Sequence, residues 1–209
     1  MIDFRLHPAI DPAALRAQFA ETGIVQIDPF LPDALVRGLA ENLSNRRDWK
    51  WIFNNGEKVY ELPRQGSDAL TAEQEARLRG AIVAQARDDF QFCFESVRVP
   101  DARHARDRSD TLHAFAEFMC GATVMELIRH VTDVAAVSFA DAQATLYRPG
   151  DFLTAHDDVV PGKQRHAAYV MGLTEHWRAE WGGLLLFHDE HGDVRRGFTP
   201  RANVLTLFS

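Results

Sequence analysis

The C-terminal third of the chain constrains the fold most, because it consists of short strand-forming runs separated by turn residues. No long helical pattern lies between these runs, as it would between the parallel strands of βαβ units. This spacing therefore predicts an antiparallel sandwich or jelly roll. The expected strands cover residues 135–140, 143–147, 152–155, 166–173, 183–188, 194–198 and 204–208.

The preceding residues, 1–134, mix helical and extended patterns and are expected to support that sheet. Asp11-Pro12 and Gly23 are start and stop signals of a helix, and Thr71 with Gln74 forms a capping-box pattern. Asn55-Gly56 has the composition of a hairpin turn. The predicted elements are helices over 13–21, 31–43, 71–94, 110–119 and 122–130, a strand over 24–28, and a hairpin of 49–53 with 58–62.

Length and composition indicate a single domain, 1–209, with a support part (1–134) and a jelly-roll core (135–209). No apolar run approaches the roughly 18 residues of a membrane span, and no signal-peptide pattern opens the chain, so we expect a cytoplasmic protein without membrane contact. The net charge of -7 disfavours nucleic acid as a partner. Cys93 and Cys120, both in apolar segments interpreted as helical, are expected to be buried thiols. The oligomeric state cannot be inferred.

The residues that bear most chemistry lie at 144–158. This segment predicts a strand, a turn and a second strand that ends at His156. Because side chains alternate along a strand, His156 and Asp158 should project to one face and Asp157 to the other. One imidazole and one carboxylate are two of the three ligands of a 2-His-1-carboxylate iron site. The pair alone leaves open a solvated loop with an ordinary histidine.

A family resemblance extends over about residues 135–209. The residues that carry it are Tyr147, the turn Pro149-Gly150, His156 and Asp158, Arg165 before an apolar strand, Trp177, Gly182-Gly183-Leu184-Leu185, and Pro200 before the strand 204–208. In their order and spacing they closely resemble the Fe(II)- and 2-oxoglutarate-dependent oxygenases, and most of all the prolyl-4-hydroxylase-like branch. The fold that this resemblance implies is a mainly β, α+β protein. Its core is a double-stranded β-helix, or cupin-like jelly roll, with helices packed on one sheet.

The resemblance also implies site residues and cofactors. His156 and Asp158 would be iron ligands, and Tyr147 would hydrogen-bond the cosubstrate, unless it is an ordinary buried strand tyrosine. Arg165 would lie near the substrate entrance, unless it is a solvated surface residue. The implied cofactors are Fe(II), the cosubstrate 2-oxoglutarate and O2, with ascorbate as a reductant.

Two parts of the family pattern are not found. The third ligand, a distal His, and the Arg or Lys that pairs with the far carboxylate of 2-oxoglutarate would both follow the strand 204–208, whereas the sequence stops at Ser209. We therefore expect a jelly roll that is incomplete at its C-terminus, in a truncated and poorly active form of the enzyme. The other histidines of this part of the chain are not expected to replace the third ligand; they are His166, His176, His188 and His191.

The leading functional hypothesis is a dioxygenase that hydroxylates a C–H bond, in a prolyl residue of a protein or peptide or in a similar small molecule. A non-catalytic jelly-roll binding module is the alternative from a different class. Within the same superfamily, a free amino-acid hydroxylase also remains open, while the acidic balance disfavours a nucleic-acid demethylase. Loops such as 61–68 and 98–108 would select the substrate, and their geometry cannot be read from the sequence.

Overall fold

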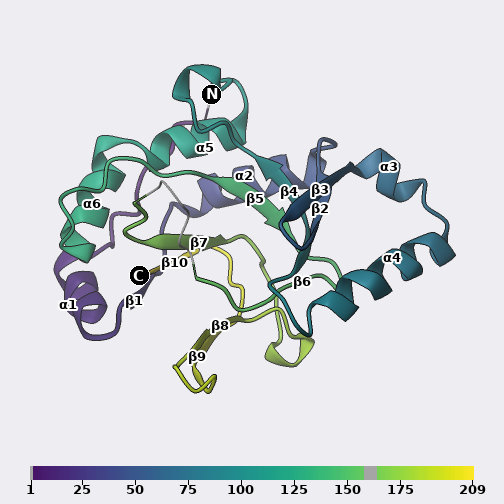
Figure 1. Ribbon diagram of the computed structural model, residues 1–209. Coiled ribbons are helices and arrows are strands. Elements are labelled where there is room, and N and C mark those ends of the chain that lie inside the picture. The colour runs from purple at the N-terminus through teal and green to yellow at the C-terminus, as the bar shows by residue number, and fades with distance from the viewer. Residues whose placement is uncertain (1, 158–163) are drawn as a thin grey trace. The chain divides into compact units, whose positions relative to one another are not determined.

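The computed structural model describes residues 2–157 and 164–209 (Figure 1). These residues cluster into two compact units, which we describe separately. The first unit draws on the chain up to Asn42, on Ala102–Asp141 and on residues from 164 onwards. The second unit consists of Leu43–Asp101 and Ala142–Asp157. Each unit therefore combines segments that are far apart in the sequence.

The first unit contains a three-stranded antiparallel sheet in the order β1-β10-β7. These strands are β1 (Ile24–Ile27), β10 (Val204–Phe208) and β7 (Ala168–Gly172). The central strand β10 is buried from Val204 to Leu207, so both of its faces are covered. Burial on both faces explains why this strand has an almost continuous apolar sequence rather than an alternating one.

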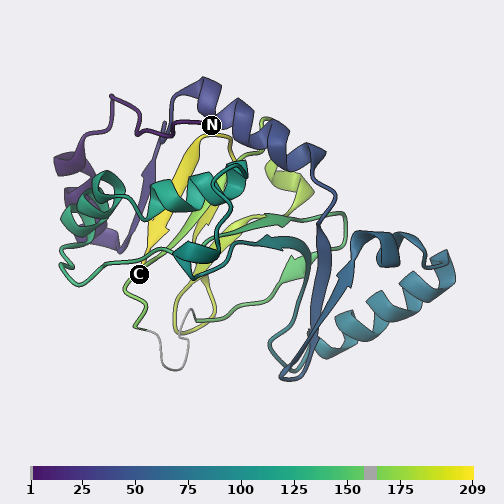
Figure 2. The same ribbon diagram turned by 90° about the horizontal axis from the view of Figure 1, so that it is seen from above.

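Helices of the first unit surround an aromatic and aliphatic core. Helix α1 packs against α6 and β1, and both views show α1 beside α6 (Figures 1 and 2). Near the start of the chain, Phe4 lies edge-on to Phe115 of α5, with ring centroids 5.4 Å apart. The bounds are α1 (Pro12–Thr22), α2 (Asp33–Asn45), α5 (Thr111–Met119), α6 (Ala122–Thr132), the 3-10 turns η1 (Arg103–Ala105) and η2 (Ala179–Trp181), and the hairpin β8 (Leu185–His188) with β9 (Val194–Phe198).

A second antiparallel sheet, in the order β3-β2-β4-β5, forms the second unit, and β6 also pairs with β4. Helix α4 packs on one face of this sheet, where Ile82 joins a buried cluster with Trp51, Phe53 and Cys93. The bounds are β2 (Lys50–Asn55), β3 (Lys58–Pro63), α3 (Arg64–Asp68), α4 (Ala72–Gln85), β4 (Phe92–Arg98), β5 (Gln143–Leu146) and β6 (Phe152–Leu153).

The local signals for helix ends are confirmed. The carboxylate of Asp11 accepts hydrogen bonds from the backbone of Ala13 and Ala14, and Gly23 ends α1 with a φ of 67°. Thr71 and Gln74 form a complete capping box at the start of α4. Such caps satisfy the free N–H groups of the first helical turn within a few residues, so they can be read from local sequence.

Three predictions about elements are wrong. The helix expected over 71–94 ends at Gln85, and 92–98, which includes Cys93, is the central strand β4 instead. Residues 135–140 form no strand, although their composition suggested one. Asn55 belongs to β2, so the hairpin turn consists of Gly56 and Glu57, and Gly56 supplies the positive φ of 57°.

The fold class is confirmed in its main features: helices pack with antiparallel sheets. The strands in the described part of the chain do not close a barrel. Among these residues no single helix is long and apolar enough to cross a membrane. The consecutive helices α5 and α6 reach the required length and hydropathy only when they are counted as one segment, and this segment is bent by 48°.

Candidate active site

A continuous series of aromatic rings runs from Tyr147 to His156 in the second unit. Tyr147, just after β5, stacks on Phe94 of β4 with centroids 5.1 Å apart. The ring centroids of Phe94 and Phe92 are 5.6 Å apart, and those of Phe92 and Phe90 are 5.7 Å apart. Phe90 in turn lies 5.5 Å from the imidazole of His156. The structure thus connects two of the predicted site residues through packing against β4 and the residues that precede it.

His156 is exposed and lies beyond the regular part of β6, which ends at Leu153. The strand expected over 152–155 is therefore shorter than predicted, and alternation along it does not orient His156. Its Nδ1 atom lies 3.0 Å from the carbonyl oxygen of Thr154. Because a carbonyl only accepts hydrogen bonds, Nδ1 carries a proton, and in the neutral form of the ring Nε2 then has the lone pair that a metal requires. The same bond restricts the ring orientation.

The backbone before His156 is held by a reciprocal contact between Thr154 and Gln91. The Gln91 N–H donates to the Thr154 hydroxyl at 2.9 Å, and that hydroxyl donates to the Gln91 carbonyl at 3.1 Å. The Thr154 N–H also donates to this carbonyl, at 3.0 Å. Pairing with the β4 side of the sheet therefore continues past the end of β6, up to two residues before His156.

Asn54 of β2 fixes the same region from the other side. Its side-chain oxygen accepts from the Phe92 N–H at 2.9 Å, and its amide nitrogen donates to the Phe90 carbonyl at 2.9 Å. The side chain of Gln91, which is fully buried, donates to the Asn54 carbonyl. Sequence reasoning missed Asn54, Gln91 and Thr154 as positioning residues. The one available signal was the polar Gln91 directly before an apolar strand.

Tyr147 presents its hydroxyl without a hydrogen-bond partner among the described residues, and 43% of its surface is exposed. Partial burial, reinforced by the negative charge of Asp151, raises the pKa of Tyr147 to about 12. The phenol is therefore protonated at neutral pH and can donate a hydrogen bond to a bound carboxylate.

Arg165 belongs to the first unit, where it forms an ion pair with Asp141 at 3.1 Å. The hydroxyl of Tyr169 on β7 donates to the Asp141 carbonyl at 3.0 Å. Burial raises the pKa of Tyr169, so this hydroxyl also stays protonated. Arg165 is thus tied to its own unit through Asp141.

Asp158 lies outside the described residues, so its position relative to His156 is not given. Within 2–157 and 164–209, no group of three or more His, Cys, Asp or Glu side chains is placed to hold a metal ion. His191 lies in the turn between β8 and β9, as predicted, and His188 ends β8. The described residues therefore supply one well-oriented imidazole of the predicted iron site.

Comparisons with known proteins concern the family and the fold. Residues 142–209 match the model of a family described as the 2OG-Fe(II) oxygenase superfamily. The match confirms, over these residues, the resemblance to this superfamily that was inferred from the sequence. It contains Tyr147, His156, Asp158 and Arg165.

One solved structure has a fold similar to that of this protein over nearly the whole chain. A prolyl-4-hydroxylase from Pseudomonas putida is 20% identical, with a TM-score of 0.57 over 94% of this chain and 86% of that one. At this identity the likeness establishes the fold. No curated protein matches the chain.

Proposed function

We propose that this protein is an Fe(II)- and 2-oxoglutarate-dependent hydroxylase that acts on a prolyl residue of a protein or peptide. The observation that carries the proposal is the match of residues 142–209 to the oxygenase superfamily, because this segment includes His156, Asp158 and Tyr147. The prolyl substrate is supported by the fold shared with a prolyl-4-hydroxylase.

His156 and Asp158 are the residues that would hold the metal. His156 fits this role, because its bond to the Thr154 carbonyl assigns the proton of the neutral ring to Nδ1. A carboxylate at position 158 completes the imidazole and carboxylate pair that ferrous ion accepts. With 2-oxoglutarate and O2, bound Fe(II) supplies the oxidation of a C–H bond to C–OH, coupled to conversion of 2-oxoglutarate to succinate and CO2.

The remaining proposed roles belong to the chain itself. Tyr147 would donate its phenolic hydrogen bond to a carboxylate of 2-oxoglutarate, a role that its raised pKa and unpartnered hydroxyl support. The rings between Tyr147 and His156 would exclude water from that side of the cosubstrate. Arg165 would contact the substrate near its entrance, and its ion pair with Asp141 would restrict the position of the guanidinium.

Metal binding tests the proposal without depending on turnover. We expect the double variant His156→Ala, Asp158→Ala to lose Mn(II) binding, followed by electron paramagnetic resonance or calorimetry. His191→Ala is the matched control, because the side chain is 74% exposed in the turn between β8 and β9 and should leave Mn(II) binding unchanged. Equal Mn(II) binding by the double variant and the parent protein would contradict the proposal and favour a non-catalytic binding module.

The substrate class needs a separate measurement. Protein loaded with Fe(II), 2-oxoglutarate and ascorbate should add one oxygen atom to a proline-containing peptide, detected by mass spectrometry. Free L-proline is the comparison that distinguishes a peptide hydroxylase from a free amino-acid hydroxylase. Oxygen addition to free proline but not to the peptide would replace the peptide assignment while leaving the metal site intact.

A further inference from the structure

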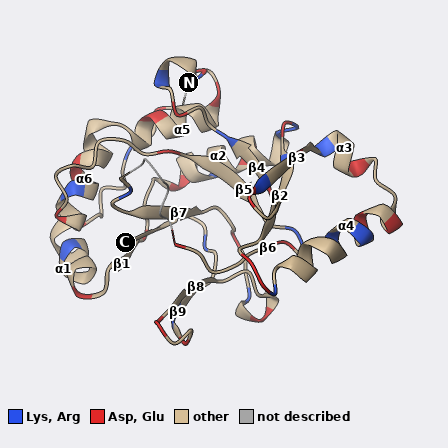
Figure 3. Ribbon diagram, in the orientation of Figure 1, with Lys and Arg blue, Asp and Glu red and all other residues tan. Residues whose placement is uncertain are grey.

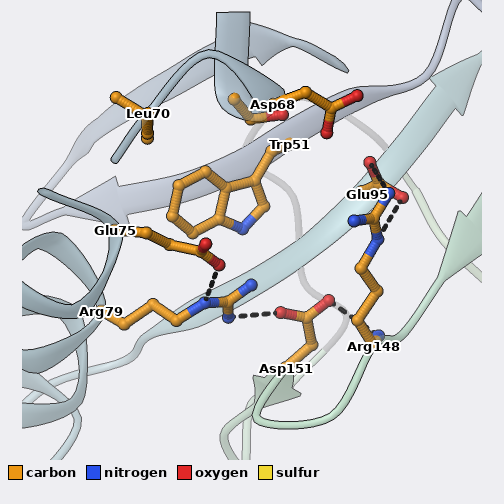
Figure 4. Close-up of a pocket in the computed structure, with 9 residues that line it drawn as sticks. Trp51, Asp68, Leu70, Glu75, Arg79, Glu95, Arg148 and Asp151 are labelled. Atoms are coloured by element: carbon orange, nitrogen blue, oxygen red, sulfur yellow. Dashed lines mark hydrogen bonds and ion pairs between the residues drawn. The ribbon is translucent and has the colours of Figure 1, made fainter. Parts of the chain in front are cut away.

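A charged pocket of about 260 Å³ opens in the second unit, on the face of the sheet that carries α3 and α4. Trp51 of β2 lies at its centre, and the guanidinium of Arg79 sits 4.8 Å from the Trp51 ring centroid (Figure 4). Both acidic and basic residues occur on α3 and α4, which contribute to its rim (Figure 3).

This pocket is separate from the candidate active site. Glu95, which lines the pocket, is adjacent in β4 to Phe94, which stacks on Tyr147. Successive side chains of a strand point to opposite faces, so the pocket and the ring series from Tyr147 to His156 lie on opposite faces of β4.

The base of the pocket is built from fully engaged carboxylates. Glu95 is 3% exposed and forms ion pairs with Arg64 at 2.5 Å and Arg148 at 3.1 Å, each through two guanidinium nitrogens. Asp151 is 1% exposed and accepts from Arg79 at 2.8 Å. These buried acids hold the three arginines in place, because moving any of them would leave a buried carboxylate with less compensating charge.

Arg148 and Arg79, which both line the pocket, each have one guanidinium nitrogen without a hydrogen bond to the described residues. Arg148 uses Nε and Nη2 on Glu95, and Nη1 has no partner among the described residues. Arg79 uses Nε on Glu75 and Nη1 on Asp151, and its Nη2 is likewise unused within that part of the chain. Both nitrogens are hydrogen-bond donors whose positions are already restricted, and guanidinium groups preferentially bind carboxylates.

Asp68 provides the opposite charge. It lies on the other side of Trp51 from Arg79 and Asp151 (Figure 4). Its exposed carboxylate makes no hydrogen bond or ion pair within the described residues. The positive charge of Arg64 acts on Asp68 without a direct ion pair, so the oxygens of this carboxylate can still bind a cationic group of a ligand.

The charge balance of the pocket disfavours a dianion. The pocket and the adjoining Arg64 together hold four carboxylates and three guanidiniums, a net charge of -1. A dicarboxylate such as 2-oxoglutarate would be repelled, whereas a ligand with one carboxylate and one ammonium matches both sets of unused groups. The volume suits a molecule of amino-acid size.

We infer that this pocket binds a small zwitterion of the amino-acid class. The carboxylate of the ligand would accept from Nη1 of Arg148 and Nη2 of Arg79. Its ammonium would pair with Asp68, and its aliphatic part would contact Leu70, which also lines the pocket. The inference does not depend on the proposed hydroxylase activity.

Three matched probes test this inference: L-norvaline, pentanoate (no ammonium) and butylamine (no carboxylate). We expect norvaline to shift the NMR signals of the Trp51 indole N–H and the Asp68 backbone of the full chain. It should bind at least about tenfold more tightly than either half-probe, because each of them leaves one charged group unpaired. Binding of pentanoate or butylamine as tightly as norvaline would overturn the inference, as would the absence of norvaline shifts at Trp51.

A variant separates the contribution of Asp68. Asp68→Asn should weaken norvaline binding about fivefold, as for a partly exposed ion pair, and leave pentanoate binding unchanged. Glu73→Gln is the control: it makes the same change of charge at an α4 residue that is 87% exposed and outside the pocket lining, and it should have no effect. The side chain of Asp68 makes no hydrogen bond or ion pair with the residues that the structure describes, so its replacement should not unfold the protein. Unchanged norvaline affinity in Asp68→Asn would refute the assignment.

Discussion

The backbone N–H of Gln91 donates a hydrogen bond to the side-chain hydroxyl of Thr154, at 2.9 Å. Gln91 is fully buried, so this N–H cannot turn to water instead. The contact holds the backbone two residues before His156, which carries the proposed metal-binding imidazole.

Replacing Thr154 with Val should therefore destabilise the protein and weaken the metal site together. The lost acceptor leaves a buried N–H unpaired, which costs about 1–3 kcal/mol. Mn(II) affinity should fall about tenfold, as for other residues that position a metal ligand. Urea unfolding and Mn(II) titration check both effects. Thr154→Ser keeps the hydroxyl and should lose no more than about 1 kcal/mol; an equal loss in both variants would contradict the hydrogen-bond explanation.

Glu95→Gln should be far more damaging than a similar change on the surface. Glu95 is 3% exposed and balances the charges of Arg64 and Arg148. Its neutralisation should lower the free energy of unfolding by about 2–3 kcal/mol. Glu61→Gln is a suitable control, because Glu61 pairs with Lys50 while 53% exposed, and it should change stability by less than about 1 kcal/mol. Urea unfolding of both variants provides the comparison.

Alkaline pH should weaken the fold through Cys93. Burial raises the pKa of this thiol to about 11, although a hydrogen bond from Trp51 opposes the shift. An ordinary cysteine thiol, as in the unfolded chain, has a pKa of about 8.5. The stability that the protonated Cys93 contributes is therefore complete below that pH and is lost as the pH rises towards 11. Urea midpoints should therefore decline less between about pH 8 and 10 for Cys93→Ser than for Cys120→Ser. Identical pH profiles of the two variants would show that ionisation of Cys93 does not cause the loss of stability at alkaline pH.

Asn203 should tolerate Gly better than Ala. Its φ is 65°, a conformation that favours glycine, and its side chain accepts from the Leu31 N–H at 2.8 Å. Both variants lose that bond, but only Ala adds backbone strain, about 1 kcal/mol. In thermal and urea unfolding, the stability of Asn203→Gly should lie between that of the parent protein and that of Asn203→Ala. The reverse order would show that the backbone conformation changes with the substitution.

Local chemistry was sufficient where a few neighbouring residues decide the outcome. Asp11, Gly23 and the pair of Thr71 with Gln74 predicted helix ends correctly, because each cap satisfies groups within its own turn. The motif residues Tyr147 to Asp158 indicated the oxygenase superfamily, and the match of 142–209 confirms it. The assignments of His156, Asp158, Tyr147 and Arg165 to individual roles stay predictions.

The strand β4 shows where periodicity failed. The helix expected over 71–94 extends into this strand because Phe90 and Phe94 continue the apolar spacing of α4. In the structure this strand is covered on both faces, so its apolar residues do not alternate and do not distinguish a strand from a helix. Its pairing with β2, β5 and β6, all distant in sequence, determines its conformation.

By itself, then, the sequence determined the caps, most of the strands and the class of chemistry, because these depend on residues close together in the chain. Only the tertiary structure decided that Gln91 meets Thr154 and that Glu95 binds both Arg64 and Arg148. Such partners are separated by dozens of residues, and they meet because buried polar groups must find a partner within the folded chain. That requirement predicts that a partner exists, but the sheet register selects which residue it is.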